Sequence, residues 1–207
     1  MNSNHFIIQL NRADYITIGG AVFSALSVAA ALQHWYYLAI AFLYLAMLGD
    51  ALDGILARNL DIVRPFGRYL DGFMDQLIYL ISPSIILYLS GYQSWYSLFI
   101  ILMIISGCLR LSVFNEVGNI QDEDRLSYLG MPVFWSLFIV SGYALVGLVA
   151  TPGLTHLLLT LVLLAFSIAM LWDRPFYKFK HLSTIVSTTL AGFVLFTGLH
   201  FWSLYVQ

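Results

Sequence analysis

Long apolar runs separated by short polar segments occupy most of the chain. Each run is close to the roughly 20 residues that an α-helix needs to cross a lipid bilayer. Taken in order, the runs predict seven membrane-spanning helices, at residues 14–33, 36–58, 67–90, 95–115, 131–150, 154–172 and 182–206. Thr151-Pro152-Gly153 is expected to form a tight turn between the fifth and sixth helices, because an unbroken helix there would be about twice too long. Pro83 lies inside the third run and is expected to kink that helix.

The composition supports this architecture. Of the 207 residues, 60% are hydrophobic and only 10% are charged, which is typical of a polytopic membrane protein and leaves no room for a soluble domain. We therefore expect an all-α membrane helix bundle. It has an N-terminal interfacial segment at residues 1–13, a six-helix core at 14–172, and a basic loop with a seventh helix at 173–207. Residues 5–12 are compatible with either a short interfacial helix or a frayed terminus.

The basic residues orient the bundle. With seven spans, all nine fall at one end: Arg12, Arg58, Arg64, Arg68, Arg110, Arg125, Arg174, Lys178 and Lys180. By the positive-inside rule, this end and the N-terminus lie in the cytoplasm, and the C-terminus lies outside. Tryptophan and tyrosine residues at the opposite end are expected to form an aromatic belt. We expect His34, His156 and His200 to be interface residues at that end and not metal ligands. The absence of a basic cluster outside the short loops argues against nucleic-acid binding.

Four aspartates interrupt the apolar pattern of the second and third helices. Asp50 and Asp53 are three residues apart, and Asp71 and Asp75 are four apart, so each pair shares one helix face. If these helices form a hairpin that turns at the membrane surface, the four carboxylates lie at two matched depths, with Asp50 and Asp75 about 12 Å in and Asp53 and Asp71 about one turn shallower. Each carboxylate costs roughly 2.5–3.5 kcal/mol at the centre of a lipid-facing helix, which favours compensation by a bound cation. Ligands that are all oxygen suit Mg²⁺ or Mn²⁺, as one ion or a pair.

The residues around these aspartates match a known pattern. The chain fits D-x2-D-G-x2-A-R-x8-G-x3-D-x3-D at all eight fixed positions: Asp50, Asp53, Gly54, Ala57, Arg58, Gly67, Asp71 and Asp75. It therefore resembles the CDP-alcohol phosphotransferase family, over about residues 14–172. The resemblance implies an integral membrane enzyme that moves a phosphatidyl group from CDP-diacylglycerol to the hydroxyl of a small alcohol and releases CMP. It also implies a homodimer among membrane lipids, with the active site facing the cytoplasm.

The resemblance assigns roles to the matching positions. Asp50, Asp53, Asp71 and Asp75 are the expected metal ligands, and Asp71 and Asp75 are also the expected catalytic residues. Asp75 fits a general base that takes the proton of the acceptor hydroxyl. The residues expected to bind the cytidine diphosphate are Gly54, Ala57, Arg58 and Gly67, with Arg58 as a phosphate partner.

Two shorter strings are similar to the phosphatidylserine synthase branch of this family. One runs from Arg110 to Asn115 and continues at 128–132, and the other is Asp14-Tyr15-Ile16-Thr17. The chain departs from the branch at Ser112-Val113, where Ala-Arg is usual, and near Gly19-Gly20, where an asparagine is expected. L-Serine is the acceptor that this similarity favours. Its candidate binding residues are Arg110, Asn115 and Arg125.

Other functions stay open at this point. Glycerol phosphate or inositol phosphate acceptors would use two or more basic residues, for which Arg64, Arg68 and Arg110 are available. Intramembrane carboxylates with glycines also occur in cation transporters. Against a transporter, all four aspartates lie in one half of the membrane and no inverted repeat is visible.

Overall fold

A computed structural model describes residues 8–118, 120–122, 125–177 and 182–206. Its helices are α1 (Arg12–Leu32), α2 (Tyr36–Asn59), α3 (Pro65–Asp75), α4 (Ser82–Leu89), α5 (Ser97–Val117), α6 (Trp135–Val146), α7 (Pro152–Leu171) and α8 (Leu182–Val206). A π-helical segment, η1 (Gln76–Ile81), joins α3 to α4, and a 3₁₀ turn, η2 (Ser94–Tyr96), precedes α5. Of the segment 5–12, residues 8–11 are not helical, and residues 5–7 lie outside the described part.

The predicted all-α membrane bundle is confirmed. Within the described residues, six helices are long and apolar enough to cross a membrane: Arg12–Leu32, Tyr36–Asn59, Pro65–Leu89, Ser94–Val117, Pro152–Leu171 and Leu182–Val206. The remaining predicted span, 131–150, contains only the 12-residue helix α6. Its ends continue as tight turns in which the N–H groups of Ser136 and Val149 donate to carbonyls three residues earlier.

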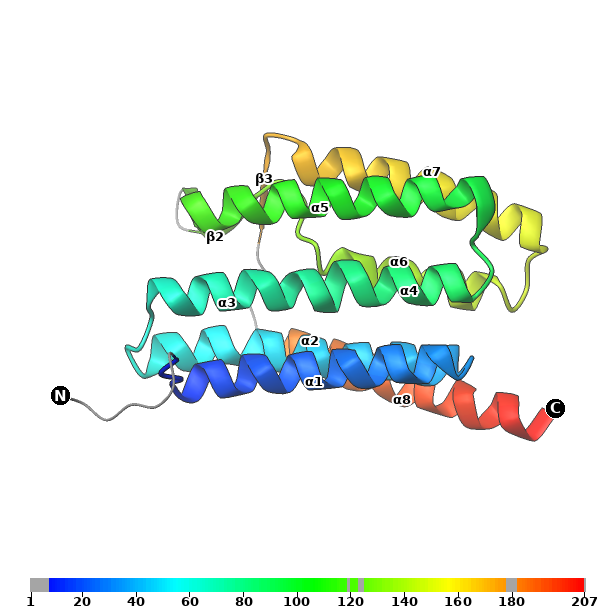
Figure 1. Ribbon diagram of the computed structural model, residues 1–207, viewed down its shortest axis with the longest axis horizontal. Helices are drawn as coiled ribbons and strands as arrows, with labels where there is room; N and C mark the ends of the chain where they lie inside the picture. Colours follow the sequence, from blue (N-terminus) through cyan, green and yellow to red (C-terminus); the bar gives the residue numbers. More distant parts are fainter. Residues whose placement is uncertain (1–7, 119, 123–124, 178–181, 207) are drawn as a thin grey trace.

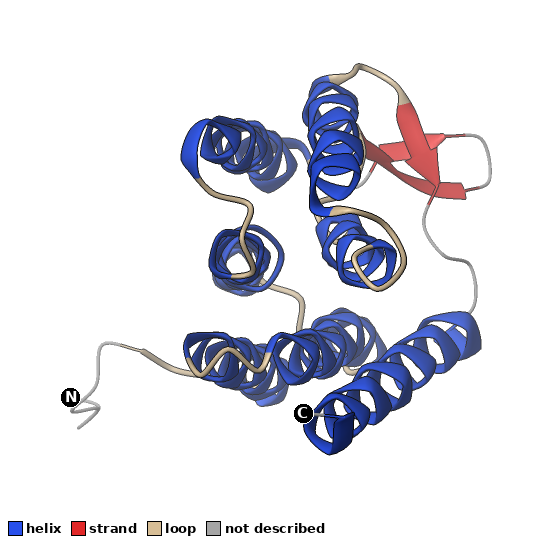
Figure 2. Ribbon diagram, turned by 90° about the vertical axis from the view of Figure 1, so that its right-hand side faces the viewer, coloured by secondary structure: helices blue, strands red, loops and turns tan. Residues whose placement is uncertain are grey.

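The helices lie side by side along the long axis, and the two ends of the chain lie at opposite ends of the bundle (Figure 1). Viewed along the helices, α1, α2 and α8 form one layer, and α5 and α7 lie on the far side of the bundle (Figure 2). The third span lies between them, and its η1 segment contacts α1, α2, α5 and α6. Side chains on this central span can therefore reach most of the bundle.

Glycines set two of the closest helix contacts. A Cβ atom added to Gly49 of α2 would lie 3.1 Å from the Cα atom of Gly20 in α1, so these two backbones approach closely. A Cβ atom added to Gly192 of α8 would lie 2.4 Å from the ring of Tyr44 in α2. The seventh predicted helix is therefore docked against the core through a glycine notch that accepts an aromatic ring.

A small antiparallel sheet lies at one end of the bundle, in segments that fall between the predicted helices. Its strands are β1 (Ile120–Asp122), β2 (Arg125–Leu129) and β3 (Pro175–Tyr177), in the order β1-β2-β3. In the β2–β3 pair, Tyr128 lies opposite Phe176. The chain leaves β2 through Gly130, whose φ is +72° and whose N–H donates to the carbonyl of Arg174.

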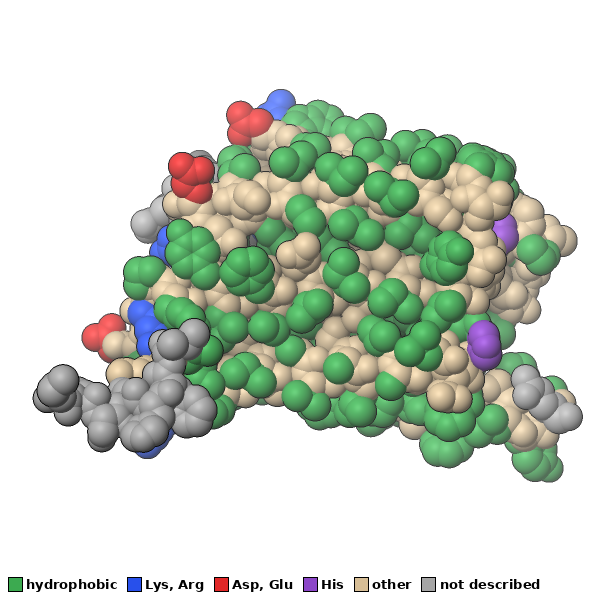
Figure 3. Space-filling view, viewed as in Figure 1, with side chains coloured by type: hydrophobic (Ala, Val, Ile, Leu, Met, Phe, Trp, Pro, Cys, Tyr) green, Lys and Arg blue, Asp and Glu red, His purple; other side chains and the backbone are tan. Residues whose placement is uncertain are grey.

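Charged and aromatic residues separate to opposite ends. The face in Figure 3 shows acidic and basic side chains at the end that holds the N-terminus, and histidines at the other. There His156 packs against the rings of Tyr92, Tyr96 and Tyr143 at centroid distances of 5.5, 5.0 and 6.1 Å. This agrees with the sequence interpretation of that end as an aromatic belt. Lys178 and Lys180 lie outside the described residues.

Candidate active site

The third span is locally irregular next to its aspartates. Pro83 has no N–H and its ring excludes the helical hydrogen bond to the carbonyl four residues earlier, that of Tyr79. The hydroxyl of Ser136 in α6 donates to this carbonyl instead. The π-helical segment η1 begins directly after Asp75 and ends at Ile81, two residues before Pro83. The expected disturbance at Pro83 therefore takes the form of a widened turn.

Three of the predicted metal ligands come together between α2 and α3. The carboxylates of Asp50, Asp53 and Asp71 each offer an oxygen, and these oxygens all lie within 4.8 Å of one another. Asp53 is 5% exposed, whereas Asp50 and Asp71 are half-buried. The helical hairpin thus brings the two halves of the sequence motif to one place.

Hydroxyl groups from two other segments support this cluster. Thr17 of α1 donates a hydrogen bond to Oδ2 of Asp53. Tyr79 of η1 donates to Oδ2 of Asp50 at 2.7 Å. Sequence reasoning quoted Thr17 only as part of a similar string and missed Tyr79. Tyr79 follows Asp75 by four residues, which would share a face in a regular α-helix, but this spacing does not by itself predict a hydrogen bond to Asp50 on another helix.

Asp75 lies beside the three clustered carboxylates. It is buried, its carboxyl group is within hydrogen-bonding reach of Asp50, and Asp71 and Arg110 are near enough to interact with it electrostatically. Within the described part of the chain, its Oδ1 atom has no hydrogen-bond partner. A buried carboxylate oxygen in that position is costly unless a cation or a ligand satisfies it. Together with the all-oxygen donor set, this fits a site for a hard divalent cation.

Residues of α5 face this site from the other side. Arg110 is 4% exposed, and its guanidinium lies over the Phe114 ring, 5.2 Å from the ring centroid. The amide of Asn115 packs on Gly72, where an added Cβ atom would meet its nitrogen at 2.6 Å. Both predicted acceptor-binding residues of this helix are therefore close to α3. The backbone of Arg125 lies in β2 opposite Asp122, and its side chain is outside the described part.

The residues predicted to bind cytidine diphosphate lie toward the charged end. Arg58 is exposed and folds back over Gly54, so that a Cβ atom there would lie 3.3 Å from its Nη1 atom. Ala57 is half-buried on the same helix. Gly67 lies in the first turn of α3, and a Cβ atom on it would meet Oδ1 of Asp14 at 3.7 Å. At both glycines, the space of the missing side chain is thus bordered by a charged side chain, that of Arg58 at Gly54 and that of Asp14 at Gly67.

Arg64 and Arg68 are placed differently from each other. Arg64 forms an ion pair with Asp14 and donates to the carbonyl of Gln9 at 2.7 Å. Arg68 lies near the end of α5, where a Cβ atom on Gly118 would be 3.8 Å from its guanidinium. Arg64 is therefore engaged in joining the start of α1 to the start of α3.

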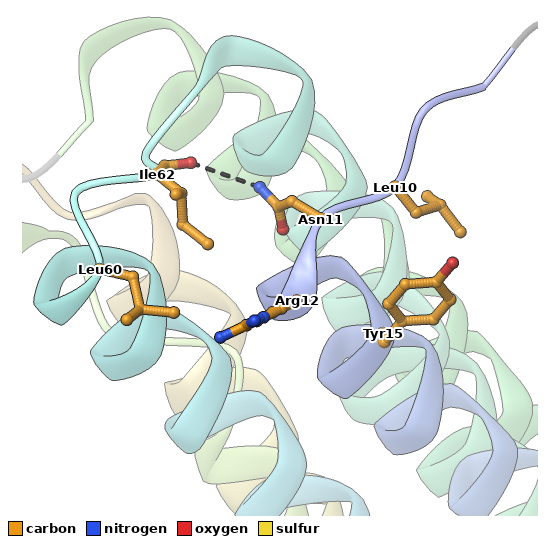
Figure 4. A pocket seen from close by; sticks show the side chains of 6 residues that line it. All are labelled: Leu10, Asn11, Arg12, Tyr15, Leu60 and Ile62. Carbon is orange, nitrogen blue, oxygen red and sulfur yellow. Dashed lines mark hydrogen bonds between the residues drawn. The ribbon is translucent and has the colours of Figure 1, made fainter.

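A separate cavity of about 430 Å³ opens at the charged end, away from the aspartates. Its lining residues are Leu10, Asn11, Arg12, Tyr15, Leu60 and Ile62. Figure 4 shows Asn11 reaching across it to donate to the carbonyl of Ile62, a distance of 3.4 Å. This hydrogen bond ties the start of α1 to the loop between α2 and α3.

Comparison with known proteins decides the family. The model of the CDP-alcohol phosphatidyltransferase family matches residues 10–205. The chain belongs to this family. The match includes α8, which the sequence analysis had left outside the resemblance. Members of the family are transferases, and the six long apolar helices make this chain an integral, multi-pass membrane protein. Three close aspartates in such a chain form a site that could hold a divalent metal.

Two kinds of curated relative are similar to the chain. A CDP-diacylglycerol–serine O-phosphatidyltransferase of Bacillus subtilis is 32% identical over 121 residues, covering 57% of this chain and 66% of the relative. A phosphatidylcholine synthase of Rhizobium johnstonii is 27% identical over 154 residues, covering 72% of this chain and 61% of the relative. The serine transferase of Saccharomyces cerevisiae is 27% identical over 158 residues, covering 69% and 57%. The matches thus span less than two thirds of each relative, and the relatives differ in their named product.

Proposed function

We propose that this protein transfers the phosphatidyl group of CDP-diacylglycerol to the hydroxyl of a small polar alcohol, with L-serine as the favoured acceptor. The observation that carries the proposal is the meeting of Asp50, Asp53 and Asp71 beside the buried carboxyl group of Asp75. Family membership supports the reaction class. The similarity to the serine transferase of Bacillus subtilis supports the acceptor.

The metal centre would be held by Asp50, Asp53 and Asp71, with Asp75 as a further ligand or neighbour. A bound Mg²⁺ or Mn²⁺, as one ion or a pair, would neutralise the diphosphate and stabilise the charge that develops on the leaving CMP. Arg58 would bind a phosphate oxygen, and the small residues Gly54, Ala57 and Gly67 would leave room for the nucleotide. These assignments follow the positions of the sequence motif.

Asp71 and Asp75 are the proposed catalytic residues. Asp75 would take the proton from the acceptor hydroxyl, whose oxygen then forms a bond to the phosphorus of the phosphatidyl group. The bond from that phosphorus to the CMP oxygen breaks, and CMP leaves with the bonding electrons. The reaction needs no covalent enzyme intermediate, because the acceptor oxygen attacks directly. Asp75 is buried beside Asp50, which suits a base that must work out of bulk water.

The acceptor site would lie between α3 and α5. A serine carboxylate needs a cation, and Arg110 is a buried cation within electrostatic range of Asp75. Asn115 would add a hydrogen bond from the same helix, and Arg125 is a further candidate. Choline is the second candidate acceptor, because phosphatidylcholine synthases also resemble the chain. Phosphorylated polyols are less favoured, because Arg64 is already paired with Asp14.

The proposed orientation places this site in the cytoplasmic half of the membrane. It rests on the gathering of basic residues at the same end as the motif. A homodimer is proposed by analogy with the family. Family membership leaves no reason to pursue the cation transporter.

Release of CMP from CDP-diacylglycerol by the purified protein tests the proposal. The assay supplies Mn²⁺ or Mg²⁺ and compares L-serine, choline, glycerol 3-phosphate, inositol 1-phosphate and no acceptor, with Asp75→Asn as the inactive control. Stimulation by serine alone is the expected result. Stimulation by choline or a phosphorylated polyol would keep the reaction but reassign Arg110 and Asn115. No release with any acceptor and either metal would refute the proposed transfer.

A further inference from the structure

We propose that Tyr79 is a positioning residue of the metal centre. Its hydroxyl holds the Asp50 carboxylate in the orientation that the cation requires. The inference deepens the proposed function and rests on it, because it concerns the ligands of the proposed cation. It also gives a role to the π-helical turn between α3 and α4, which the reaction itself leaves unexplained.

Tyr79 joins two parts of the bundle through its two polar groups. Its side chain is 1% exposed, and its hydroxyl donates to Oδ2 of Asp50 at 2.7 Å. Its carbonyl accepts a hydrogen bond from Ser136 of α6. The backbone of Tyr79 is therefore fixed from α6, while its side chain reaches α2. The aromatic ring also packs edge-on against Phe134, at a centroid distance of 6.5 Å.

The irregular turn explains why this side chain reaches Asp50. Pro83 frees the carbonyl of Tyr79, and Ser136 takes it up, so the main chain is anchored at this point without a regular helical hydrogen bond. The widened turn begins at Gln76, directly after Asp75. A change in helical phase at that place rotates Tyr79 relative to the aspartates of α3. Such turns are frequent at functional sites.

A buried hydroxyl group in an apolar helix needs a partner, and phenylalanine would fill the same space without that need. Here the partner is a carboxylate of the candidate metal site. A hydrogen bond to a charged acceptor is strong and directional, so it restricts rotation of the Asp50 carboxylate. Thr17 makes the corresponding contact to Asp53 from α1. The two aspartates of α2 are thus each oriented by a hydroxyl from a different helix.

Partners of this kind typically affect metal affinity by about 10- to 100-fold when they are removed. The test is Tyr79→Phe, which deletes one oxygen atom and keeps the ring. The measurement is Mn²⁺ binding to the purified, substrate-free protein, read from the electron paramagnetic resonance signal of free Mn²⁺. We expect the Mn²⁺ affinity to fall by about 10-fold or more. The Mn²⁺ concentration for half-maximal CMP release should rise in parallel, while kcat at saturating Mn²⁺ recovers most of its value.

The matched control is Tyr92→Phe. Tyr92 is also fully buried and its hydroxyl bonds to Thr160 at 2.6 Å, but it lies at the opposite end of the bundle. It should lose thermal stability without a change in Mn²⁺ affinity. An unchanged Mn²⁺ affinity in Tyr79→Phe, or an equal loss in the control, would overturn the proposal. Failure of the wild-type protein to bind Mn²⁺ would instead refute the metal centre of the proposed function.

A second measurement keeps the test independent of folding defects. If Tyr79 acts through Asp50, the double variant Asp50→Asn/Tyr79→Phe should bind Mn²⁺ as weakly as Asp50→Asn alone. Additive losses in the double variant would show that Tyr79 acts by another route and would overturn the positioning role.

Discussion

Gly72 offers a sharp test of how α5 meets the active site. In the structure, a Cβ atom added to Gly72 would lie 2.6 Å from the amide nitrogen of Asn115 and 2.7 Å from its amide oxygen. Favourable carbon contacts begin near 3.5 Å, so the Gly72→Ala substitution must displace the amide by about 1 Å. The amide stands at the end of a short side chain and can rotate away. The backbone of α5 therefore need not move.

The two effects on stability oppose each other. Overpacking costs typically about 1–3 kcal/mol, while replacing glycine by alanine inside a helix gains roughly 1 kcal/mol. We expect Gly72→Ala to unfold with a free energy within about 2 kcal/mol of the wild-type value. The function should suffer more. If Asn115 binds the acceptor carboxylate, losing that hydrogen bond costs about 1.5–3 kcal/mol, which is a rise in KM for serine of roughly 10- to 100-fold.

The assay is CMP release at varied serine and saturating CDP-diacylglycerol, with thermal unfolding measured in the same detergent. Gly142→Ala in α6 is the matched control, because no atom lies within 4 Å of its added Cβ position. It should keep the wild-type KM and gain slightly in stability. In the double variant Gly72→Ala/Asn115→Ala, the clash is gone, and the amide group of Asn115 is absent as well. If it returns to the wild-type KM, Asn115 only packs against α3, and its proposed role in acceptor binding is refuted.

Three further predictions test other parts of the structure. Removal of divalent metal with EDTA should abolish CMP release, and added Mn²⁺ or Mg²⁺ should restore it; release that persists in EDTA would contradict the metal centre. Arg110→Gln should raise the KM for serine at least tenfold and change the KM for CDP-diacylglycerol little, since one charge-assisted contact contributes about 1.5–3 kcal/mol; an unchanged serine KM would remove Arg110 from the acceptor site. Gly192→Ala should lower the free energy of unfolding by about 1–3 kcal/mol, because its Cβ atom would enter the Tyr44 ring at 2.4 Å. Gly198→Ala in the same helix meets no atom within 4 Å and should gain slightly in stability, so an equal loss in both variants would argue against this docking contact.

The membrane architecture could be predicted because its cause is local. A run of about 20 apolar residues must form a helix in lipid, where every backbone polar group needs an internal partner. The seven apolar runs and the uncharged far end were therefore visible in the chain. The sheet of β1, β2 and β3 was not, because its strands are short and β2 pairs with β3 about 50 positions away, through backbone hydrogen bonds that leave no periodic pattern.

For the active site, the sequence by itself determined the ligand types and their spacing. Asp50 and Asp53 share one face of α2, and Asp71 and Asp75 share one face of α3, through the fixed period of the α-helix, so their meeting needed only a hairpin. The tertiary structure alone decided what surrounds them. Tyr79 reaches Asp50 because Pro83 and Ser136 redirect one turn of the third span, and Asn115 reaches α3 because Gly72 has no side chain. Such contacts depend on the packing of helices far apart in the chain, and no local pattern of residues encodes them.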